Sequence, residues 1–499
     1  MAHRPLLAIL VSWLAAGLIL CSGRRPNLRD TWTVLAAGVQ FVLVLSLLQA
    51  VSAGQVVEAA YVELLPGLAL QLRADSFGLL FALLASGLWL LTSLYSVGYM
   101  RAGQYPHQTG YGASFAVALS ATMGVAFAAN LLTFFVFYEL LTLATYPLVA
   151  HNRDAAALAA GRKYLAYTLG AGQCLLVLLV WLQQLAPGAT FQPGGVLAGK
   201  ASTGELVVLC LLGVMGVGVK AAIMPLHGWL PAAMVAPTPV SALLHAVAVV
   251  KAGTFGCIRL IHYVFGLDVL HALGADMVLA GAAGATVLLA SIRALGESHL
   301  KRRLAYSTVS QLSYIVLGAV LGSPAALAGA MFHMAAHGYM KITLFFCAGA
   351  IDMQTHRLDI STFAGLGRQM PITFGAFTLG ALGLAGTPLF VGFISKWQLG
   401  LGAIQAGHAV FLGILVLSGL LNVAYFFPII VTAFFGQGVS SARVREARAL
   451  VWVPLALTAL LSLVLGIVPN AGLHLYHLAW QAAGQLMAGP TPRPAGGAP

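Results

Sequence analysis

The sequence predicts an all-α protein that crosses a membrane about fourteen times. Of its 499 residues, 60% are hydrophobic and only 8% are charged, whereas roughly a quarter of the residues of an average soluble domain are charged. Apolar runs near 20 residues, the length a bilayer-spanning helix needs, recur along the whole chain. A soluble protein of this length would divide into domains joined by polar linkers, and the sequence contains no such linker.

The expected spans follow one another at short intervals. They lie near residues 5–22, 31–52, 76–99, 111–129, 131–150, 163–186, 204–225, 237–262, 268–291, 304–322, 325–350, 371–400, 408–436 and 449–469. The first resembles a signal peptide in its basic start and apolar run. It lacks a small-residue cleavage site before a polar region, so we interpret it as an uncleaved span.

Basic residues indicate the orientation of the spans. The net charge is +12, but the Lys and Arg residues are not clustered with stacking aromatics, which argues against nucleic-acid binding. Of the 25 Lys and Arg residues, sixteen fall in odd-numbered loops: Arg24, Arg25, Arg29, Arg101, Arg153, Arg162, Lys163, Arg293, Lys301, Arg302, Arg303, Arg357, Arg368, Arg443, Arg445 and Arg448. Five fall on the other side: Arg4, Arg73, Lys200, Arg259 and Arg493. The positive-inside rule then predicts a bacterial-type inner membrane protein with both termini outside.

Several kinds of chemistry are unsupported by the sequence. The five cysteines lie in separate apolar runs, which excludes a C-x-x-C zinc or iron–sulfur motif. There is no phosphate-binding loop and no dinucleotide fingerprint. We therefore expect no cofactor and no metal, and any redox activity belongs to partner subunits. Energy has to come from an ion gradient or from a partner.

Two spans are interrupted in similar ways. The seventh contains glycines, Lys220 and Pro225, and the twelfth contains glycines, Pro388 and Lys396. Proline removes a helix hydrogen bond, so we expect helix breaks at both sites. If spans four to eight and nine to thirteen are two five-helix repeats, the broken helices are the fourth member of each, and the odd span number makes the repeats inverted. Coincidence in a glycine-rich protein is the alternative.

This reasoning divides the chain into four parts. Residues 1–110 hold the first three helices, 111–263 the first repeat, 264–436 the second repeat, and 437–499 the last helix with a short Gly/Pro/Ala-rich tail.

Ionisable residues inside the spans are the candidate functional groups, because they are costly in a bilayer. Glu139 is the acidic residue placed deepest in a span, and Lys220 and Lys251 are its expected partners. Burial favours neutral lysine while a nearby carboxylate favours the charged form, so such a lysine can accept and release a proton. The alternatives are a structural ion pair for Glu139 and snorkelling for lysines near span ends.

The eleventh span carries a row of titratable residues. His333, His337 and Lys341 recur every four residues and share one helix face. Histidine titrates near neutral pH, so the row is suited to a proton relay. Zinc binding and packing histidines are the alternatives, although the glutamate of a zinc helix motif is missing. His245 precedes Lys251 by six residues, and a direct contact between them requires helix distortion or water.

These residues lie in motifs that resemble a known family. The chain is similar to the antiporter-like membrane subunits of respiratory complex I and to the large D-type subunits of Mrp-type multisubunit cation/proton antiporters. The resemblance covers roughly residues 75–435. The matching stretches are residues 220–231 (KAAIMPLHGWLP), 236–245 (APTPVSALLH), 300–311 (LKRRLAYSTVSQ), 333–341 (HMAAHGYMK) and 392–396 (GFISK).

The resemblance implies two inverted repeats, a Glu139–Lys220 coupling pair and Lys396 as the terminal relay lysine. It also implies a hydrated axis through Lys251 and the row from His333 to Lys341. The chain has only about 30 residues after its last expected span and a lysine at position 396, which favours an Mrp-type large subunit or a homologous subunit of a complex I-like or hydrogenase-like assembly.

The expected function is therefore proton or Na⁺/H⁺ translocation within a complex of membrane subunits, in contact with lipid and not with nucleic acid. A proton-pumping subunit of a complex I-like NADH:quinone oxidoreductase or a membrane hydrogenase is one alternative, and a membrane subunit of an inorganic-carbon uptake system is another.

Overall fold

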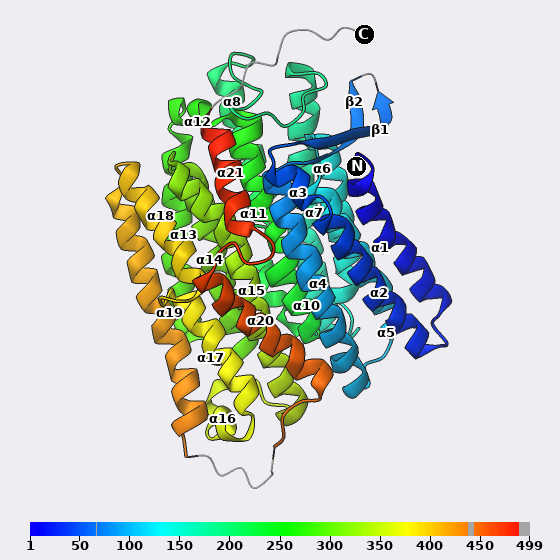
Figure 1. Cartoon of the computed structure of the whole chain (residues 1–499). Helices are drawn as coiled ribbons and strands as arrows, with labels where there is room; N and C mark the ends of the chain where they lie inside the picture. The colour runs from blue at the N-terminus through cyan, green and yellow to red at the C-terminus, as the bar shows by residue number, and fades with distance from the viewer. Residues whose placement is uncertain (66, 438–443, 489–499) are drawn as a thin grey trace.

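The protein is a bundle of long helices in a computed structural model that describes residues 1–65, 67–437 and 444–488. Figure 1 shows the helices running alongside one another, with α1 and α2 on one side of the bundle and α18 and α19 on the opposite side. The α-helices are α1 (Arg4–Cys21), α2 (Pro26–Leu45), α3 (Leu48–Ser52), α4 (Ser76–Ala102), α5 (Gln108–Ala126), α6 (Leu131–Val149), α7 (Ala155–Leu185), α8 (Thr203–Gly218), α9 (Trp229–Ala232), α10 (Thr238–Ala242), α11 (Val249–Arg259), α12 (Leu267–Ala272), α13 (Ala275–Gly296), α14 (Leu300–Val320), α15 (Pro324–Thr355), α16 (Leu366–Gln369), α17 (Pro371–Ala385), α18 (Val391–Gln405), α19 (Ala409–Phe435), α20 (Ala449–Ile467) and α21 (Leu475–Met487).

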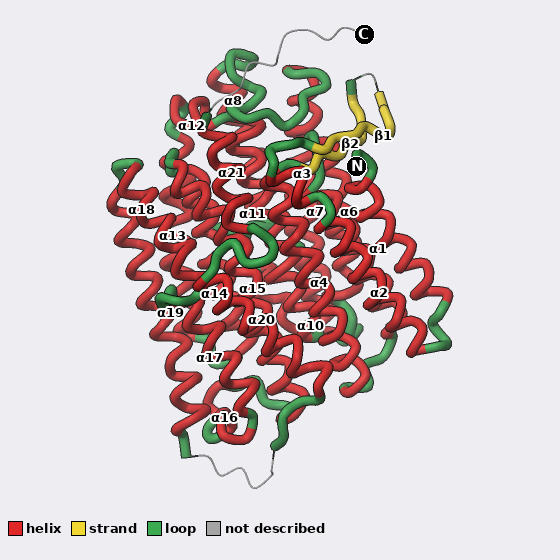
Figure 2. Tube along the Cα trace, in the orientation of Figure 1, coloured by secondary structure: helices red, strands yellow, loops and turns green. Residues whose placement is uncertain are grey.

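Short irregular segments interrupt several of these helices. The 3-10 segments are η1 (Ala233–Val235) and η4 (Ile360–Phe363), and the π-helical segments are η2 (Leu243–Val247) and η3 (Leu260–Phe265). Figure 2 shows helix throughout most of the described chain.

The polytopic helical fold is confirmed. Within the described residues, ten helices are long and apolar enough to cross a membrane, and Thr203–Gly218 and Pro371–Ala385 are shorter apolar helices. Each predicted span overlaps at least one helix, while the number of crossings stays a prediction. Two spans, Thr238–Phe265 and Pro324–Thr355, are completely buried along their apolar windows, so they form the centre of the bundle.

Local sequence signals fix where several helices begin. Asp75, Asn130, Asp154, Ser202 and Ser323 each accept a hydrogen bond from a backbone N–H in the first turn of the helix that follows. Such caps satisfy N–H groups that have no partner inside the helix. They define the starts of α4, α6, α7, α8 and α15.

A β-hairpin between α3 and α4 is the one strand pair in the described residues, and it adds a small feature to the predicted helical fold. Strands β1 (Val57–Leu65) and β2 (Leu68–Ala74) pair antiparallel, with Val57 opposite Ala74. The segment carries polar residues among apolar ones and follows the expected second span, so it lacks the uninterrupted apolar run of a bilayer helix. In Figure 1 the hairpin lies at the same end of the bundle as the N-terminus.

The segment after the last expected span also differs from its prediction as a tail. Residues Leu475–Met487 form helix α21, which packs against α15 and α4. Its buried residues recur at helical spacing on one face: Leu475, Leu478, Ala479, Ala482, Ala483 and Leu486. The part of the predicted tail from residue 489 onward lies outside the described residues.

Some basic residues that the orientation argument placed in loops are buried in the bundle. Arg259 ends α11 and is 1% exposed, and Lys301 lies in the first turn of α14 and donates to the Ala236 carbonyl at 2.6 Å. Arg443 and Arg493 lie outside the described residues. These side chains do not report on orientation in the way exposed loop residues do, so the orientation stays a prediction.

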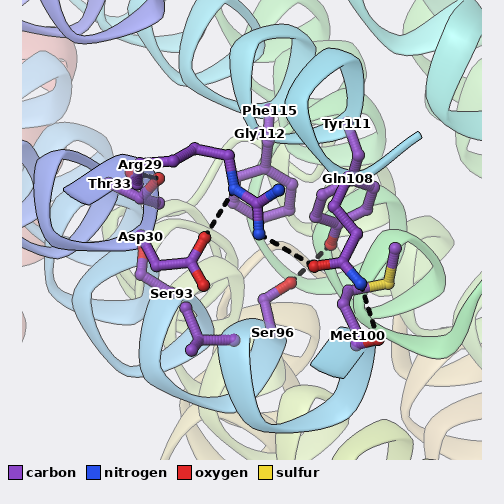
Figure 3. A pocket seen from close by; sticks show the side chains of 11 residues that line it. Arg29, Asp30, Thr33, Ser93, Ser96, Met100, Gln108, Tyr111, Gly112 and Phe115 are labelled. Atoms are coloured by element: carbon purple, nitrogen blue, oxygen red, sulfur yellow. Dashed lines mark hydrogen bonds and ion pairs between the residues drawn. The ribbon is translucent and has the colours of Figure 1, made fainter. Parts of the chain in front are cut away.

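Arg29 is another buried residue of this kind. Its guanidinium donates to Asp30 at 2.8 Å and to the Gln108 side-chain oxygen at 2.8 Å. Figure 3 shows these bonds in a small polar cavity of about 30 Å³, between α2, α4 and α5, which Ser93 and Tyr111 also line. The cavity is large enough for a water molecule. Arg29 therefore stabilises helix packing.

Candidate functional site

The candidate residues lie in the interior of the bundle, and we refer to them together as the row. Six of them have side chains with 0% exposure: Lys220, His245, Lys251, His333, His337 and Lys341. Glu139 and Lys396 are half-buried. Full burial of this many ionisable groups is costly and needs either partners or function to account for it.

The first helix break lies where it was predicted. Helix α8 ends at Gly218 and α9 begins at Trp229, so Lys220 and Pro225 lie in the interruption. The Trp229 indole N–H donates to the Val219 carbonyl at 2.7 Å. Because a broken helix leaves carbonyls without partners, this bond makes the break tolerable inside an apolar bundle.

Lys220 contacts the residue next to Glu139. Its Nζ donates to the Tyr138 carbonyl at 2.5 Å and lies 3.3 Å from the centroid of the Tyr138 ring. The ion pairs within 4.0 Å among the described residues do not include Glu139 with Lys220. Lys220 therefore lies beside the α6 residue that precedes Glu139. Its ammonium group contacts the Tyr138 carbonyl and ring and forms no ion pair with the Glu139 carboxylate within 4.0 Å.

The Glu139 carboxylate points toward α7. A Cβ at Gly172 would lie 2.6 Å from the Glu139 Cδ, so an alanine there would make the carboxylate move from this position. Its Oε1 is buried and has no hydrogen-bond partner among the described residues. A carboxylate in this setting is open to a mobile cation or a proton.

The eighth predicted span is distorted at His245. The π-helical segment Leu243–Val247 precedes α11, which carries Lys251. A π-helical turn shifts the side chains that follow it relative to a straight helix, and such turns are frequent at functional sites. Both ring nitrogens of His245 are buried without a partner among the described residues, and its ring lies 4.8 Å from that of Phe345.

Lys251 joins α11 to the histidine row on α15. The distance between Lys251 Nζ and His337 Nδ1 is 2.8 Å. A neutral imidazole accepts this bond at Nδ1 when its proton is on Nε2. Proton exchange between the two groups needs only a short movement. This contact connects the two halves of the row.

His333 continues the row toward α18. Its Nδ1 lies 2.8 Å from the Ser395 hydroxyl and its Nε2 lies 3.1 Å from the Gln311 side-chain oxygen. The rings of His333 and His337 are 6.2 Å apart between centroids, consistent with their i, i+4 spacing. Ser395 directly precedes Lys396, so His333 contacts the neighbour of the terminal lysine.

Lys341 lies one turn beyond His337 and contacts α14. Its Nζ donates to the Ser307 hydroxyl at 2.9 Å and to the Leu304 carbonyl at 3.3 Å. These neutral acceptors replace part of the hydration that an ammonium group loses on burial.

The second helix break places Lys396 at a helix end. Helix α17 ends at Ala385 and α18 begins at Val391, with Pro388 between them. The Lys396 ammonium donates to the Leu384 carbonyl, one of the carbonyls at the end of α17 that have no partner in the helix. The partial negative charge of a helix C-terminus favours a cation there.

A groove of about 570 Å³ opens beside Lys396. Apolar residues of α18 and α19 form most of its wall, including Trp397, Leu412 and Leu420. Trp397 and Leu420 are largely exposed, as expected of side chains that face lipid or a partner helix. The row therefore reaches the outside of the bundle near Lys396.

Metal binding has no support in this geometry. No group of three or more His, Cys, Asp or Glu side chains in the described parts of the chain is arranged to hold a metal ion. The two histidines on α15 instead contact a lysine, a serine and a glutamine.

A family model agrees with these observations. The model described as "NADH:quinone oxidoreductase/Mrp antiporter, TM" matches residues 128–422, more than half of the chain. The chain belongs to this family. The match includes both helix breaks and every candidate residue from Glu139 to Lys396.

Members of the family with similar sequences come from two kinds of complex. The chain is 35% identical over 376 residues to NADH-quinone oxidoreductase subunit N of Desulforudis audaxviator, covering 73% of this chain and 74% of that protein. It is 33% identical to the A/B subunit of a probable K⁺/H⁺ antiporter of Rhizobium meliloti, covering 81% of this chain but 40% of that protein.

Solved structures share the fold. A chain of the Mrp complex from Dietzia sp. DQ12-45-1b superposes with a TM-score of 0.85 at 23% identity, covering 97% of each chain. A chain of respiratory complex I from Thermus thermophilus superposes with a TM-score of 0.81 at 24% identity, covering 97% of this chain and 99% of that one. The antiporter-like membrane fold predicted from the motifs is confirmed.

Several contacts of the row were not predicted from the sequence. Gly172, Ser307, Gln311 and Ser395 contact row residues or limit the space around them. Ser307, Gln311 and Ser395 lie in the motif stretches 300–311 and 392–396, but the motifs do not show which side chains these residues contact. Gly172 lies outside the motifs.

Proposed function

We propose that the chain is a proton-translocating membrane subunit of an Mrp-type cation/proton antiporter complex, exchanging H⁺ alone or Na⁺ for H⁺. The observation that carries this proposal is the row of buried ionisable side chains from half-buried Glu139 to half-buried Lys396. Family membership places the chain among subunits of multisubunit membrane complexes. Other integral membrane subunits are therefore its expected partners.

In the proposed mechanism, protons move between neighbouring groups of the row. Glu139 and Lys220 form the coupling pair, Lys251 and His337 the central junction, and Lys396 the terminal station. The unpartnered nitrogens of His245 and His337 support water within the row, because buried polar atoms are normally hydrogen-bonded. His333 continues the path from the junction toward α18, and Lys341 lies one turn from His337 in the opposite direction, against α14.

The architecture behind this mechanism is also a proposal. Residues 111–263 and 264–436 form two inverted repeats, each with its broken helix fourth, and residues 1–110 and 437–499 flank them. We place the chain in a bacterial-type inner membrane with both termini outside. The two similar breaks, each with a lysine in it or shortly after it, support this arrangement.

A redox-driven complex is the second candidate. The 35% identity to NADH-quinone oxidoreductase subunit N over 73% of this chain favours it. In that case the same row carries protons and the energy comes from partner subunits.

Purification of the tagged chain in mild detergent, with its partners identified by mass spectrometry, distinguishes the candidates. Small hydrophobic partners and cation-dependent proton flux in reconstituted vesicles are the result expected for an antiporter. Iron–sulfur, flavin or hydrogenase partners with redox-dependent flux would establish the second candidate instead. A complex without proton flux under a cation gradient or a redox substrate would contradict both.

A further inference from the structure

A pair of arginines lies at the end of the bundle away from the β-hairpin, where α1 meets α2 and α4 meets α5. The Arg29 guanidinium donates to Asp30 and to Gln108 at 2.8 Å each (Figure 3). Arg101 donates to the other oxygen of Asp30 at 2.6 Å and to the Pro26 carbonyl at 3.1 Å. One carboxylate thus holds two arginines side by side, and one positive charge of the pair has no counter-charge.

The arginine pair is fixed in place by its neighbours. The Gln108 amide donates to the Met100 and Tyr105 carbonyls at 3.0 Å each, so its oxygen faces Arg29. Nη1 of Arg29 and Nη1 of Arg101 have no hydrogen-bond partner among the described residues, and the Arg29 nitrogen still reaches the surface. Donors that are already held in position lose little freedom when they bind an anion, which favours binding.

These donors face an open cavity of about 530 Å³, a size typical of ligand pockets. The residues that line it are Pro26, Arg29, Arg101, Gln104, Tyr105 and Gln108. None of them is acidic. Arg24 and Arg25, which directly precede Pro26, are exposed and form no ion pair within 4.0 Å among the described residues. The cavity is therefore positively charged, and it is suited to an anionic group.

The cavity lies at the expected boundary of the bilayer. Its residues belong to the short segments 23–30 and 100–110, which connect expected spans. Beside it, the outer face of α2 carries exposed apolar side chains that recur at helical spacing: Leu28, Leu35, Val39 and Val42. A basic cavity at the end of an exposed apolar stripe matches a molecule with an anionic head and a hydrocarbon tail.

We propose that this cavity binds the phosphate headgroup of an anionic phospholipid. Arg29 and Arg101 contact the phosphate, and the apolar stripe of α2 contacts the acyl chains. The proposed orientation places this end of the bundle on the cytoplasmic side, where anionic lipids are recognised by basic pockets between helices. An acidic segment of a partner protein would match the charge of the cavity but would leave the stripe uncovered. The site is separate from the row, so the inference does not rest on proton translocation.

The test is native mass spectrometry of the assembled complex, stripped of lipid in neutral detergent and titrated with phosphatidylglycerol. Phosphatidylcholine has the same phosphate but a compensating positive charge, so we expect it to bind at least about tenfold more weakly. Inorganic phosphate lacks the acyl chains and should not displace the lipid. Equal binding of the two lipids would overturn the inference. Displacement by inorganic phosphate would assign the cavity to a free anion and would overturn it as well.

Two variants locate the binding site. Arg101→Gln removes one contact to the phosphate, and Gln104→Glu places a negative charge in the cavity without removing a side-chain hydrogen bond of the described residues. We expect each variant to bind phosphatidylglycerol about fivefold more weakly, the contribution of one basic residue near a membrane surface. Arg357→Gln changes an exposed arginine that follows α15 and is the matched control, which should bind as the wild type does.

The variants also decide against the inference if they leave binding unchanged. If Arg101→Gln does not assemble, Gln104→Glu decides alone. An assembled complex that binds no phosphatidylglycerol because a partner subunit covers the cavity would overturn the inference too. Lipid binding is measured without proton flux, so its failure and the failure of the proposed function are distinguishable.

Discussion

The two helix breaks look alike in sequence but create different surroundings for their lysines. Lys220, in the break between α8 and α9, is fully buried, and its Nζ contacts a carbonyl and an aromatic ring of α6. Lys396, after the break between α17 and α18, is half-buried, binds a helix-end carbonyl and lies beside a 570 Å³ groove. A helix break thus leaves its lysine fully enclosed in the first half of the chain and beside an open groove in the second half.

The largest expected effect is at the enclosed station. Lys220→Ala or Glu139→Gln should abolish proton transport without stopping assembly, because each removes one partner of the coupling pair. The measurement is proton flux per assembled complex in vesicles. Lys200→Ala, a change to an exposed loop lysine, is the control and should transport normally. Full transport in either row variant would rule out the coupling pair.

At Lys396, beside the groove, two substitutions distinguish the role of its exchangeable proton from the role of its positive charge. Arginine keeps its charge but does not release a proton at physiological pH. Both Lys396→Arg and Lys396→Met should therefore lower proton flux by at least about tenfold, equivalent to roughly 1.4 kcal/mol on the barrier. Normal flux in Lys396→Arg would mean that only the charge matters, and Lys396 would not be a relay group.

Two glycines of α7 test the setting of Glu139. Gly172→Ala places a methyl group against the carboxylate, whereas Gly170 has open space around it. We expect Gly172→Ala to reduce proton flux several-fold and Gly170→Ala to leave it unchanged. The control is useful because both changes raise helix propensity by up to about 1 kcal/mol. Equal flux in the two variants would contradict the placement of the carboxylate.

The smallest effect on transport is expected at an ion pair outside the row. Arg259 donates to both oxygens of Asp75 at 2.7 and 2.8 Å. Burial alone would raise the pKa of Asp75, but the Arg259 charge and the Gly78 N–H bring it below the ordinary value. Asp75→Asn leaves a buried arginine unpaired, which typically costs about 3–5 kcal/mol.

Thermal unfolding in detergent measures that cost. Because the folded pKa of Asp75 is lowered, its contribution to stability is present above the unfolded pKa, near 3.9, and is lost as the pH falls through the folded value. The difference between wild type and Asp75→Asn should thus be large at pH 7 and shrink in strong acid. An equal difference at both pH values would show that the ion pair is not its source.

Much of the fold was predictable because bilayer helices need long apolar runs and proline ends a helix. The breaks at Pro225 and Pro388 follow from that rule. The hairpin formed by β1 and β2 was missed because its strands mix polar with apolar residues and lack a long apolar run. Helix α21 was missed because its apolar residues lie on one face, which packs against other helices.

The candidate site shows the same division. Lysines and histidines inside predicted membrane spans are conspicuous because placing them in a bilayer costs free energy. The row could therefore be identified from residue types. Their partners could not: the contact between Lys251 and His337 depends on the packing of two central helices that are 86 residues apart at these positions.

The contact between Lys251 and His337 is the most direct place to test a continuous relay, since it joins the two halves. The decisive measurement is proton flux in vesicles containing the assembled complex with Lys251→Met, compared with wild type and with Lys200→Met. A relay through this contact predicts at least about a tenfold loss of flux in Lys251→Met and normal flux in the control. Undiminished flux in Lys251→Met would contradict the account.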